Sequence, residues 1–207
     1  MFAPRVGPSL SLFFLIGGAL LLAALRNPGP AEALEAAAAG LFLLGLFLAF
    51  FFRDPERPVG QGIVAPADGR VLSVQTEDRW VRIAVFMSVA DVHVNRFPMD
   101  ARVREVDTGG KGHDPAYRDD AARNVRRTYW LATEVGEVRL VQITGFLARR
   151  LVSFVGPGAE RRRGDRLGMI VLGSRVDLWL PASRVAVRVR PGERVRAGVT
   201  TLAEALP

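Results

Sequence analysis

Three short clusters of polar residues hold the side chains best suited to chemistry. The first contains Asp68 in the tetrapeptide PADG, the second contains His93 in DVHVNR, and the third contains Ser174 after Gly173 in LGSR. An aspartate, a histidine and a serine are groups that move protons and attack carbonyl carbon. Each cluster also has an ordinary interpretation, because Asp-Gly and Gly-Ser are frequent turn sequences and a single histidine often has only a structural role. No cluster identifies an activity by itself.

The second cluster has a spacing that favours acid–base chemistry. If the chain is extended over residues 91–96, alternation places Asp91, His93 and Asn95 on one face. A histidine with polar neighbours on its own face is a candidate acid or base, because imidazole exchanges protons near neutral pH.

The composition excludes several kinds of site. The 207 residues include no cysteine and two histidines. This excludes disulfides, zinc–thiolate sites, iron–sulfur clusters, a cysteine nucleophile and a three-histidine metal site, and we expect no metal. Lys111 is the single lysine, so a pyridoxal phosphate Schiff base would have to use it. The chain also lacks GxxxxGK[ST], GxGxxG and HExxH motifs.

The first 52 residues have the composition of a membrane hairpin. Residues 6–25 and 36–52 are free of charge, and at ~1.5 Å per residue each spans most of a ~30 Å hydrocarbon core. A short link rich in proline and glycine joins them. We therefore predict a two-helix hairpin in residues 1–52 and a catalytic domain in residues 53–207. The competing interpretations are a signal peptide and the buried helices of a globular core.

The charges of residues 1–52 cancel, so the whole net charge of +7 belongs to residues 53–207. A basic domain next to a membrane anchor favours anionic membrane lipids as partners, and the run Arg161 to Arg163 is a candidate contact. Nucleic acid is not expected, because the arginines lack interleaved aromatic residues that stack on bases. Arginines after the second apolar stretch predict that the domain lies on the cytoplasmic side of the cell membrane.

Beyond residue 53 the sequence is typical of short strands punctuated by glycine and proline. The apolar or β-branched runs are 70–74, 80–87, 101–106, 137–144, 167–172, 175–180 and 184–189. The best helix candidate is residues 115–126. We predict a β-dominated (α+β) fold, in which an N-terminal two-helix transmembrane hairpin precedes a barrel- or sandwich-like domain of short strands.

Taken in order, these motifs resemble the phosphatidylserine decarboxylase family, and most closely its short bacterial and archaeal branch. The matching segments are RDPER at 53–57, PADGRV at 66–71, the stretch 86–98 with FMS and DVHVNR, ITGFLARR at 143–150, and GDRLGMIVLGSRVDLWLP at 164–181. The resemblance extends from about residue 53 to residue 200.

The resemblance implies a cofactor made from the chain itself. The Ser174 hydroxyl would attack the carbonyl of Gly173 to give an ester, and elimination followed by hydrolysis would leave a pyruvoyl group. Glycine suits this position because a missing side chain lets the hydroxyl approach. The products would be a β chain, residues 1–173, and an α chain, residues 174–207, paired as a heterodimer. The sequence leaves a homo-oligomer open.

The resemblance also implies roles for the other two clusters. His93 would return a proton after carbon dioxide leaves, and Asp68 would help to activate Ser174. Longer family members have a second histidine three positions after the first, where this chain has Arg96. Self-cleavage is therefore expected to use Asp68 with His93, or Asp68 through water, with His113 as a fallback base.

Arginine forks match both phosphate and carboxylate groups. Substrate binding is therefore expected from the arginines of the matching motifs, which are Arg96, Arg149, Arg150 and Arg175. The implied reaction converts phosphatidylserine to phosphatidylethanolamine. Two alternatives stay open: a related substrate such as archaetidylserine, and a non-catalytic, membrane-anchored, lipid-binding β-domain.

Overall fold

The structure is a computed structural model that describes residues 2–3, 7–26, 32–112, 114–118, 121, 123–146, 150–171 and 174–207, with the side chains of residues 7–10 left out. The chain divides into two compact units, Met1–Glu56 and Arg57–Pro207.

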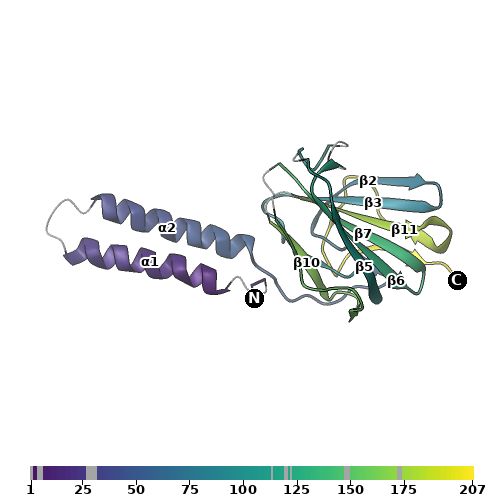
Figure 1. The fold of residues 1–207 in the computed structure, drawn as a ribbon, viewed down its shortest axis with the longest axis horizontal. Coiled ribbons are helices and arrows are strands. Elements are labelled where there is room, and N and C mark those ends of the chain that lie inside the picture. Colours follow the sequence, from purple (N-terminus) through teal and green to yellow (C-terminus); the bar gives the residue numbers. More distant parts are fainter. Residues whose placement is uncertain are drawn as a thin grey trace. The chain divides into compact units, whose positions relative to one another are not determined.

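The first unit contains two helices, α1 (Gly7–Arg26) and α2 (Glu32–Phe51), of 20 residues each. They lie side by side (Figure 1). A glycine permits this close packing, because a Cβ atom on Gly45 would lie 3.0 Å from the ring of Phe14. The prediction of two N-terminal helices is confirmed.

Membrane crossing is supported more strongly for α2 than for α1. α2 is long and apolar enough to span a bilayer, whereas the described apolar part of α1, Ser11–Arg26, is shorter. A hairpin in which both helices cross the membrane stays a prediction.

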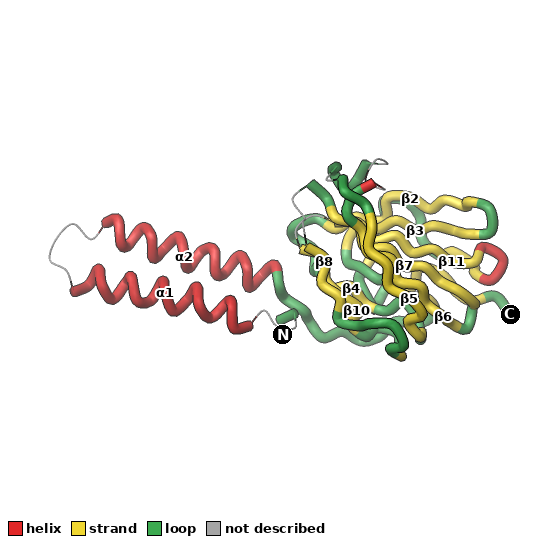
Figure 2. Tube along the Cα trace, viewed as in Figure 1, coloured by secondary structure: helices red, strands yellow, loops and turns green. Residues whose placement is uncertain are grey.

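The second unit is built from short strands, which Figure 2 shows in yellow. In chain order they are β1 (Ile63–Val64), β2 (Gly69–Glu77), β3 (Trp80–Met87), β4 (Val94–Arg96), β5 (Ala101–Gly109), β6 (Arg126–Thr133), β7 (Gly136–Thr144), β8 (Arg150–Ser153), β9 (Glu160–Arg161), β10 (Arg166–Val171), β11 (Ser174–Pro181), β12 (Val185–Val187), β13 (Arg194–Val195) and β14 (Thr201–Ala205). A 3₁₀ turn, η2 (Ala182–Arg184), follows β11.

These strands form three sheets. The largest has eight strands in the order β13-β2-β3-β11-β7-β6-β5-β9, and the smaller sheets have the orders β4-β10-β8 and β1-β14-β12. The β-dominated domain is confirmed. No sheet closes on itself among the described residues, so the barrel or sandwich detail stays a prediction. The predicted helix over residues 115–126 is wrong for the described residues, which form turns and a short 3₁₀ segment at residues 121 and 123 before β6 begins.

One apolar core joins the three sheets. Alternation along β11 places Val176, Leu178 and Leu180 in this core, together with Ile170 of β10 and Leu202 of β14. The other face of the large sheet carries the intervening residues of β11. The two faces therefore have different chemistry, and the side of β11 on which a residue lies decides what it meets.

Arginine and tryptophan side chains cover the face of the large sheet opposite the core. The Arg139 guanidinium lies 4.1 Å from the ring centroid of Trp179, 5.4 Å from that of Trp130 and 5.9 Å from that of Trp80. Burial lowers the pKa of Arg139, and the negative charges of Glu77 and Asp177 oppose this shift. A cation packed among three aromatic rings stabilises the sheet through cation–π attraction.

We expect Arg139→Ala to lower the free energy of unfolding by about 1–2 kcal/mol, because it removes these contacts from three strands. Thermal unfolding of the full chain in detergent measures the effect, with the exposed Arg190→Ala as the matched control. Equal stability of the two variants would contradict the importance of the aromatic contacts.

Candidate active site at the start of β11

The antiparallel order of the large sheet places Ser174 and the turn that carries Asp68 at the same end of the strands. β2 and β11 begin at this end, whereas β3 and β7 end there. Ser174 pairs with Met87 on one side and with Thr144 on the other. The turn that carries Asp68 is close by, because a Cβ atom on Gly69 would lie 1.9 Å from the carbonyl oxygen of Phe86. Only glycine fits there, and its φ of +144° is one that other residues rarely adopt.

Ser174 is fully buried, and its side chain lies on the core face of the sheet. Its hydroxyl donates a hydrogen bond to Met87 Sδ over 3.4 Å, and Asn95 Nδ2 approaches the same sulfur within 3.6 Å. Gly173, the other half of the predicted cleavage site, lies outside the described residues. The Ser174 hydroxyl is therefore oriented by a weak acceptor in an environment from which water is excluded.

A chain of buried polar groups continues from Asn95. Gln142 Nε2 donates to Asn95 Oδ1 over 2.7 Å, and the Tyr129 hydroxyl lies 3.1 Å from Gln142 Oε1. The same hydroxyl lies 3.0 Å from Ser153 Oγ. Burial raises the pKa of Tyr129, and its hydrogen bond to Ser153 opposes the shift. The phenol therefore stays protonated. The hydrogen bonds from Asn95 to Ser153 connect β4, β7, β6 and β8 beneath Ser174.

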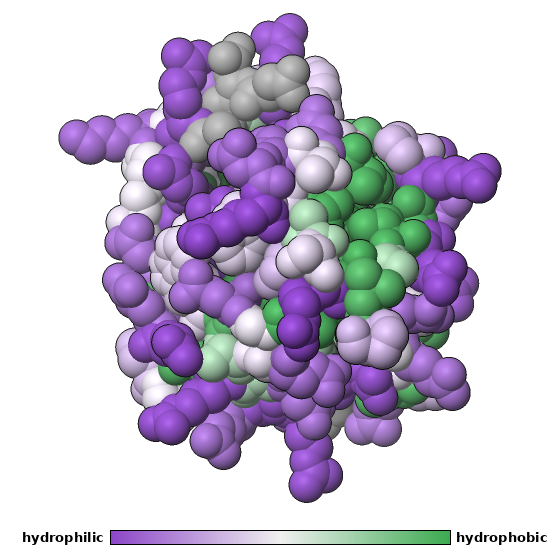
Figure 3. Space-filling view, turned by 90° about the vertical axis from the view of Figure 1, so that its right-hand side faces the viewer, coloured by the Kyte–Doolittle hydropathy of each residue, from purple (hydrophilic) through white to green (hydrophobic). Residues whose placement is uncertain are grey.

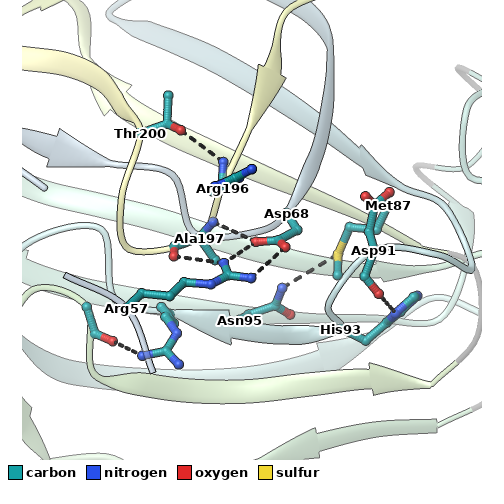
Figure 4. Close-up of polar contacts among 11 residues, drawn as sticks. Arg57, Asp68, Met87, Asp91, His93, Asn95, Arg196, Ala197 and Thr200 are labelled. Atoms are coloured by element: carbon teal, nitrogen blue, oxygen red, sulfur yellow. Dashed lines mark hydrogen bonds and ion pairs between the residues drawn. The ribbon is translucent and has the colours of Figure 1, made fainter. Parts of the chain in front are cut away.

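His93 is buried just before β4, and its ring is held in one orientation. Its Nδ1 atom lies 2.9 Å from the carbonyl oxygen of Asp91 (Figure 4). A carbonyl oxygen only accepts hydrogen bonds, so Nδ1 carries a proton and Nε2 is the atom left to exchange one. The Ile170 amide donates to the His93 carbonyl over 3.3 Å. His93 therefore lies beside β10, the strand that runs toward residues 173 and 174.

The segment before His93 is a turn, so the extended chain on which the one-face arrangement of Asp91, His93 and Asn95 depends begins only later. The Asp91 carboxylate accepts hydrogen bonds from the Ser88 amide at 2.8 Å and the Ser88 hydroxyl at 2.6 Å. The strand begins only at Val94. Asp91 thus shapes the loop through its carboxylate and orients His93 through its carbonyl.

Asp68 is held by an arginine that the sequence did not single out. Its two carboxylate oxygens accept hydrogen bonds from Arg57, at 2.5 and 2.8 Å, and the Ala197 amide donates to it over 2.8 Å. Figure 4 shows the carboxylate directed at Arg57, with Met87 and Asn95 nearby. A role of Asp68 toward Ser174 therefore acts through, or in competition with, this ion pair.

The three predicted substrate arginines that the structure describes do not gather at one point. Arg150 is exposed, and in the pairing of β8 with β10 it lies opposite Val171, three residues before Ser174. Arg96 donates to the Gly164 carbonyl over 2.9 Å. Arg175 is buried on the opposite face from Ser174, where it binds both oxygens of Asp177 at 2.6 Å. Arg149 and the fallback base His113 lie outside the described residues.

Three buried residues near the site were not predicted as site residues. Met87 is one of the apolar residues of β3, so nothing in the sequence marked it as a site residue. Asn124 is fully buried, and its Nδ2 donates to the carbonyl oxygens of Thr144 and Asp114, each over 2.7 Å. It fastens the loop before β6 to the partner strand of Ser174. A polar residue at a core position of an apolar strand was the available signal for Gln142.

The sequence matches one family of known proteins over most of its length. The family model described as phosphatidylserine decarboxylase matches residues 44–203. A phosphatidylserine decarboxylase proenzyme from Streptomyces avermitilis is 40% identical over 186 residues, which cover 89% of this chain and 85% of the relative. A proenzyme of the same name from Carboxydothermus hydrogenoformans is 40% identical, covering 78% of this chain and 81% of its own.

An archaeal relative is similar to the same degree. A putative archaetidylserine decarboxylase proenzyme from Halobacterium salinarum is 45% identical over 164 residues, covering 77% of this chain and 82% of the relative. The chain belongs to the phosphatidylserine decarboxylase family.

The ion pair between Arg57 and Asp68 makes a testable contribution to the fold. We expect Arg57→Ala and Asp68→Ala each to destabilise the second unit, and the double variant to be little worse than either. The coupling energy should be about 1.5–3 kcal/mol, because the pair is charged on both sides and mostly buried. Denaturant unfolding of the four proteins measures it.

The exposed pair Arg188–Glu204 provides the matched control, and its coupling should be below about 1 kcal/mol. Additive effects of the Arg57 and Asp68 substitutions would show that the two side chains stabilise the domain independently.

Proposed function

We propose that this chain decarboxylates phosphatidylserine to phosphatidylethanolamine with a pyruvoyl group that it makes from Ser174. The supporting observation is the position of Ser174, buried at the first residue of β11 between Met87 and Thr144, in a chain 40% identical over 89% of its length to a decarboxylase proenzyme. Self-cleavage would follow attack of the Ser174 hydroxyl on the Gly173 carbonyl. It would give a β chain of residues 1–173 and an α chain of residues 174–207.

The strand pairing around Ser174 fits such a break. On one side of the Gly173–Ser174 bond, β11 is paired with β3 over its whole length and with β7 over most of it. On the other side, β10 is paired with β4 and β8. Both new ends would therefore stay in their sheets, and the shared core would hold the fragments together as a heterodimer.

A pyruvoyl group at this position would supply an acceptor for the electrons released as carbon dioxide leaves. The residues around Ser174 fit it, because the site is buried and has the neutral donor Asn95 beside Met87. His93 would return the proton from Nε2, since Nδ1 is bound to the Asp91 carbonyl. Asp68, paired with Arg57, would hold the turn next to Met87 during self-cleavage.

Arg150 would be the first residue to bind the substrate, because it is exposed and is paired with Val171, close to Ser174 in the chain. Arg96 and Arg149 complete the proposed set for phosphate and carboxylate. Arg175 would act indirectly, because its guanidinium is bound to Asp177 on the other face. The first unit would anchor the chain in the cell membrane, with residues 53–207 on the cytoplasmic side and in contact with anionic lipids.

A second substrate deserves consideration because of the archaeal relative. The Halobacterium salinarum proenzyme is named for archaetidylserine and is 45% identical to this chain. The two lipids present the same serine headgroup, so the site at Ser174 suits both. Assays with both lipids at equal surface concentration distinguish them.

We expect Ser174→Ala to remain a single chain without decarboxylase activity, because it removes the attacking hydroxyl. Denaturing electrophoresis and release of carbon dioxide from labelled phosphatidylserine measure the two losses. Ser183→Ala, a substitution in the exposed turn after β11, should be cleaved and active. A cleaved and active Ser174→Ala protein would remove Ser174 from the proposal.

We expect His93→Ala to lower kcat by roughly 10²–10⁴-fold, the usual contribution of a positioned general acid. Cleavage into two fragments is scored separately, so that a defect in self-processing is told apart from a defect in turnover. A cleaved His93→Ala enzyme with near-normal kcat would show that another group returns the proton.

A further inference from the structure

The residue that follows Ser174 carries a buried ion pair on the reverse face of the large sheet. Arg175 Nε and Nη2 donate hydrogen bonds to the two carboxylate oxygens of Asp177, each over 2.6 Å. The two side chains are each 4% exposed. The remaining nitrogen, Nη1, donates to the Arg118 carbonyl oxygen over 3.4 Å, in the loop before β6. The guanidinium therefore fastens the start of β11 to its own strand and to a neighbouring loop.

The surroundings of this ion pair are apolar. Ile143 of β7 lies opposite Arg175, and Val141 lies opposite Asp177. Both belong to a small buried cluster with Ala121. A bidentate, charge-assisted pair in such a setting is strongly directional. It adds little to net stability, however, because the cost of desolvating two charges offsets their attraction. The position that the pair fixes therefore explains it better than the free energy of folding that it contributes.

We propose that Arg175 is a positioning residue that holds the new end of the α chain after self-cleavage. In the uncut chain, peptide bonds tether residue 174 on both sides. After cleavage it is a chain end, and chain ends fray unless they are tied down. Its conversion to a pyruvoyl group also removes the backbone N–H, because the nitrogen leaves as ammonia. Arg175 is then the first residue of the α chain with both a backbone N–H and a side chain.

Arg175 acts on the reaction only through the backbone. The Ser174 hydroxyl faces Met87 in the core, whereas the Arg175 guanidinium faces Asp177 on the reverse side. A displacement of about 1 Å at a reacting group can cost roughly 10²-fold in rate, so an anchor one residue away controls turnover. The effect on turnover rests on the proposed function, whereas the anchoring of the chain end can be measured without activity.

The test removes both partners of the ion pair at once. In the double variant, Arg175→Met is combined with Asp177→Leu, so that neither charge is left buried and unpaired. Replacement of a buried ion pair by apolar residues of similar size commonly preserves the fold. Arg82, which also approaches Asp177, keeps its ion pair with Glu77. The double variant therefore loses the anchor without a large loss of stability.

The matched control is Leu180→Val, which removes one buried methylene group near the other end of β11. Figure 3 shows that end of the second unit, where hydrophilic side chains surround a smaller hydrophobic area. The control loses packing in the same strand but leaves the ion pair intact. Ser174→Ala, introduced into the wild-type chain and into the double variant, supplies the corresponding uncut proteins.

Amide hydrogen exchange of residues 175–177 reports the state of the chain end in full-length protein in detergent. In the cut proteins, exchange should be roughly tenfold faster in the double variant than in the wild type. In the uncut proteins, exchange should be equal with and without the ion pair. Equal exchange in the cut proteins would overturn the proposal. Faster exchange in the uncut double variant to the same degree would also overturn it, because the pair would then have a general structural role.

Turnover provides the second readout. Self-cleavage of the double variant should keep the wild-type rate, whereas kcat on phosphatidylserine should fall roughly 10- to 100-fold and KM should change less than about twofold. Leu180→Val should keep the wild-type kcat. A wild-type kcat in the double variant would overturn the positioning role of Arg175. A wild-type chain that is cut but inactive on phosphatidylserine would instead contradict the proposed function, and hydrogen exchange would still decide whether Arg175 holds the chain end.

Discussion

The pairing of β11 with both β3 and β7 is the constraint on which the site depends. This register fixes Ser174 between Met87 and Thr144 and places its hydroxyl on the core face, where water is excluded. A shift by one residue would move the hydroxyl to the arginine-rich face and bring Arg175 into the core. The same pairing also explains how a chain broken before Ser174 would keep its structure. The hydrogen bonds that join β11 to β3 and β7 would all remain, because the break precedes the first residue of β11.

A second constraint is the satisfaction of buried polar groups beneath Ser174. Asn95, Gln142 and Tyr129 form a continuous chain that crosses from the small sheet to the large one. Buried polar groups cost free energy when they are unpaired, and they are held in fixed positions when they are paired. These hydrogen bonds therefore fix the separation of the two sheets at the site. The Asp68 carboxylate is also paired, because it accepts hydrogen bonds from Arg57 and from the Ala197 amide. The residues proposed to react thus lie on a framework in which Asp68, Asn95, Gln142 and Tyr129 have hydrogen-bond partners.

Much of the fold followed from sequence pattern, and the misses have physical causes. The apolar run 80–87 is β3, because a strand with β-branched residues and punctuated ends leaves little ambiguity. β6 was missed because it begins with two arginines and its apolar residues, Tyr129 to Ala132, follow one another without the alternation that marks a strand. Asp68, His93 and Ser174 were proposed as site residues from their motifs, and the strand order places Ser174 and the turn with Asp68 at the same end of the large sheet. The partner of Asp68 was missed because Arg57 is 11 positions away, and no local spacing predicts a contact made through the fold.

The most direct test of the account is the intact mass of the purified full-length protein before and after reduction with borohydride. The account predicts two fragments that end and begin at the Gly173–Ser174 bond, with the smaller one gaining the mass of two hydrogen atoms on reduction because it carries a ketone. Fully active protein whose mass corresponds to one unbroken chain, and does not change with borohydride, would contradict it.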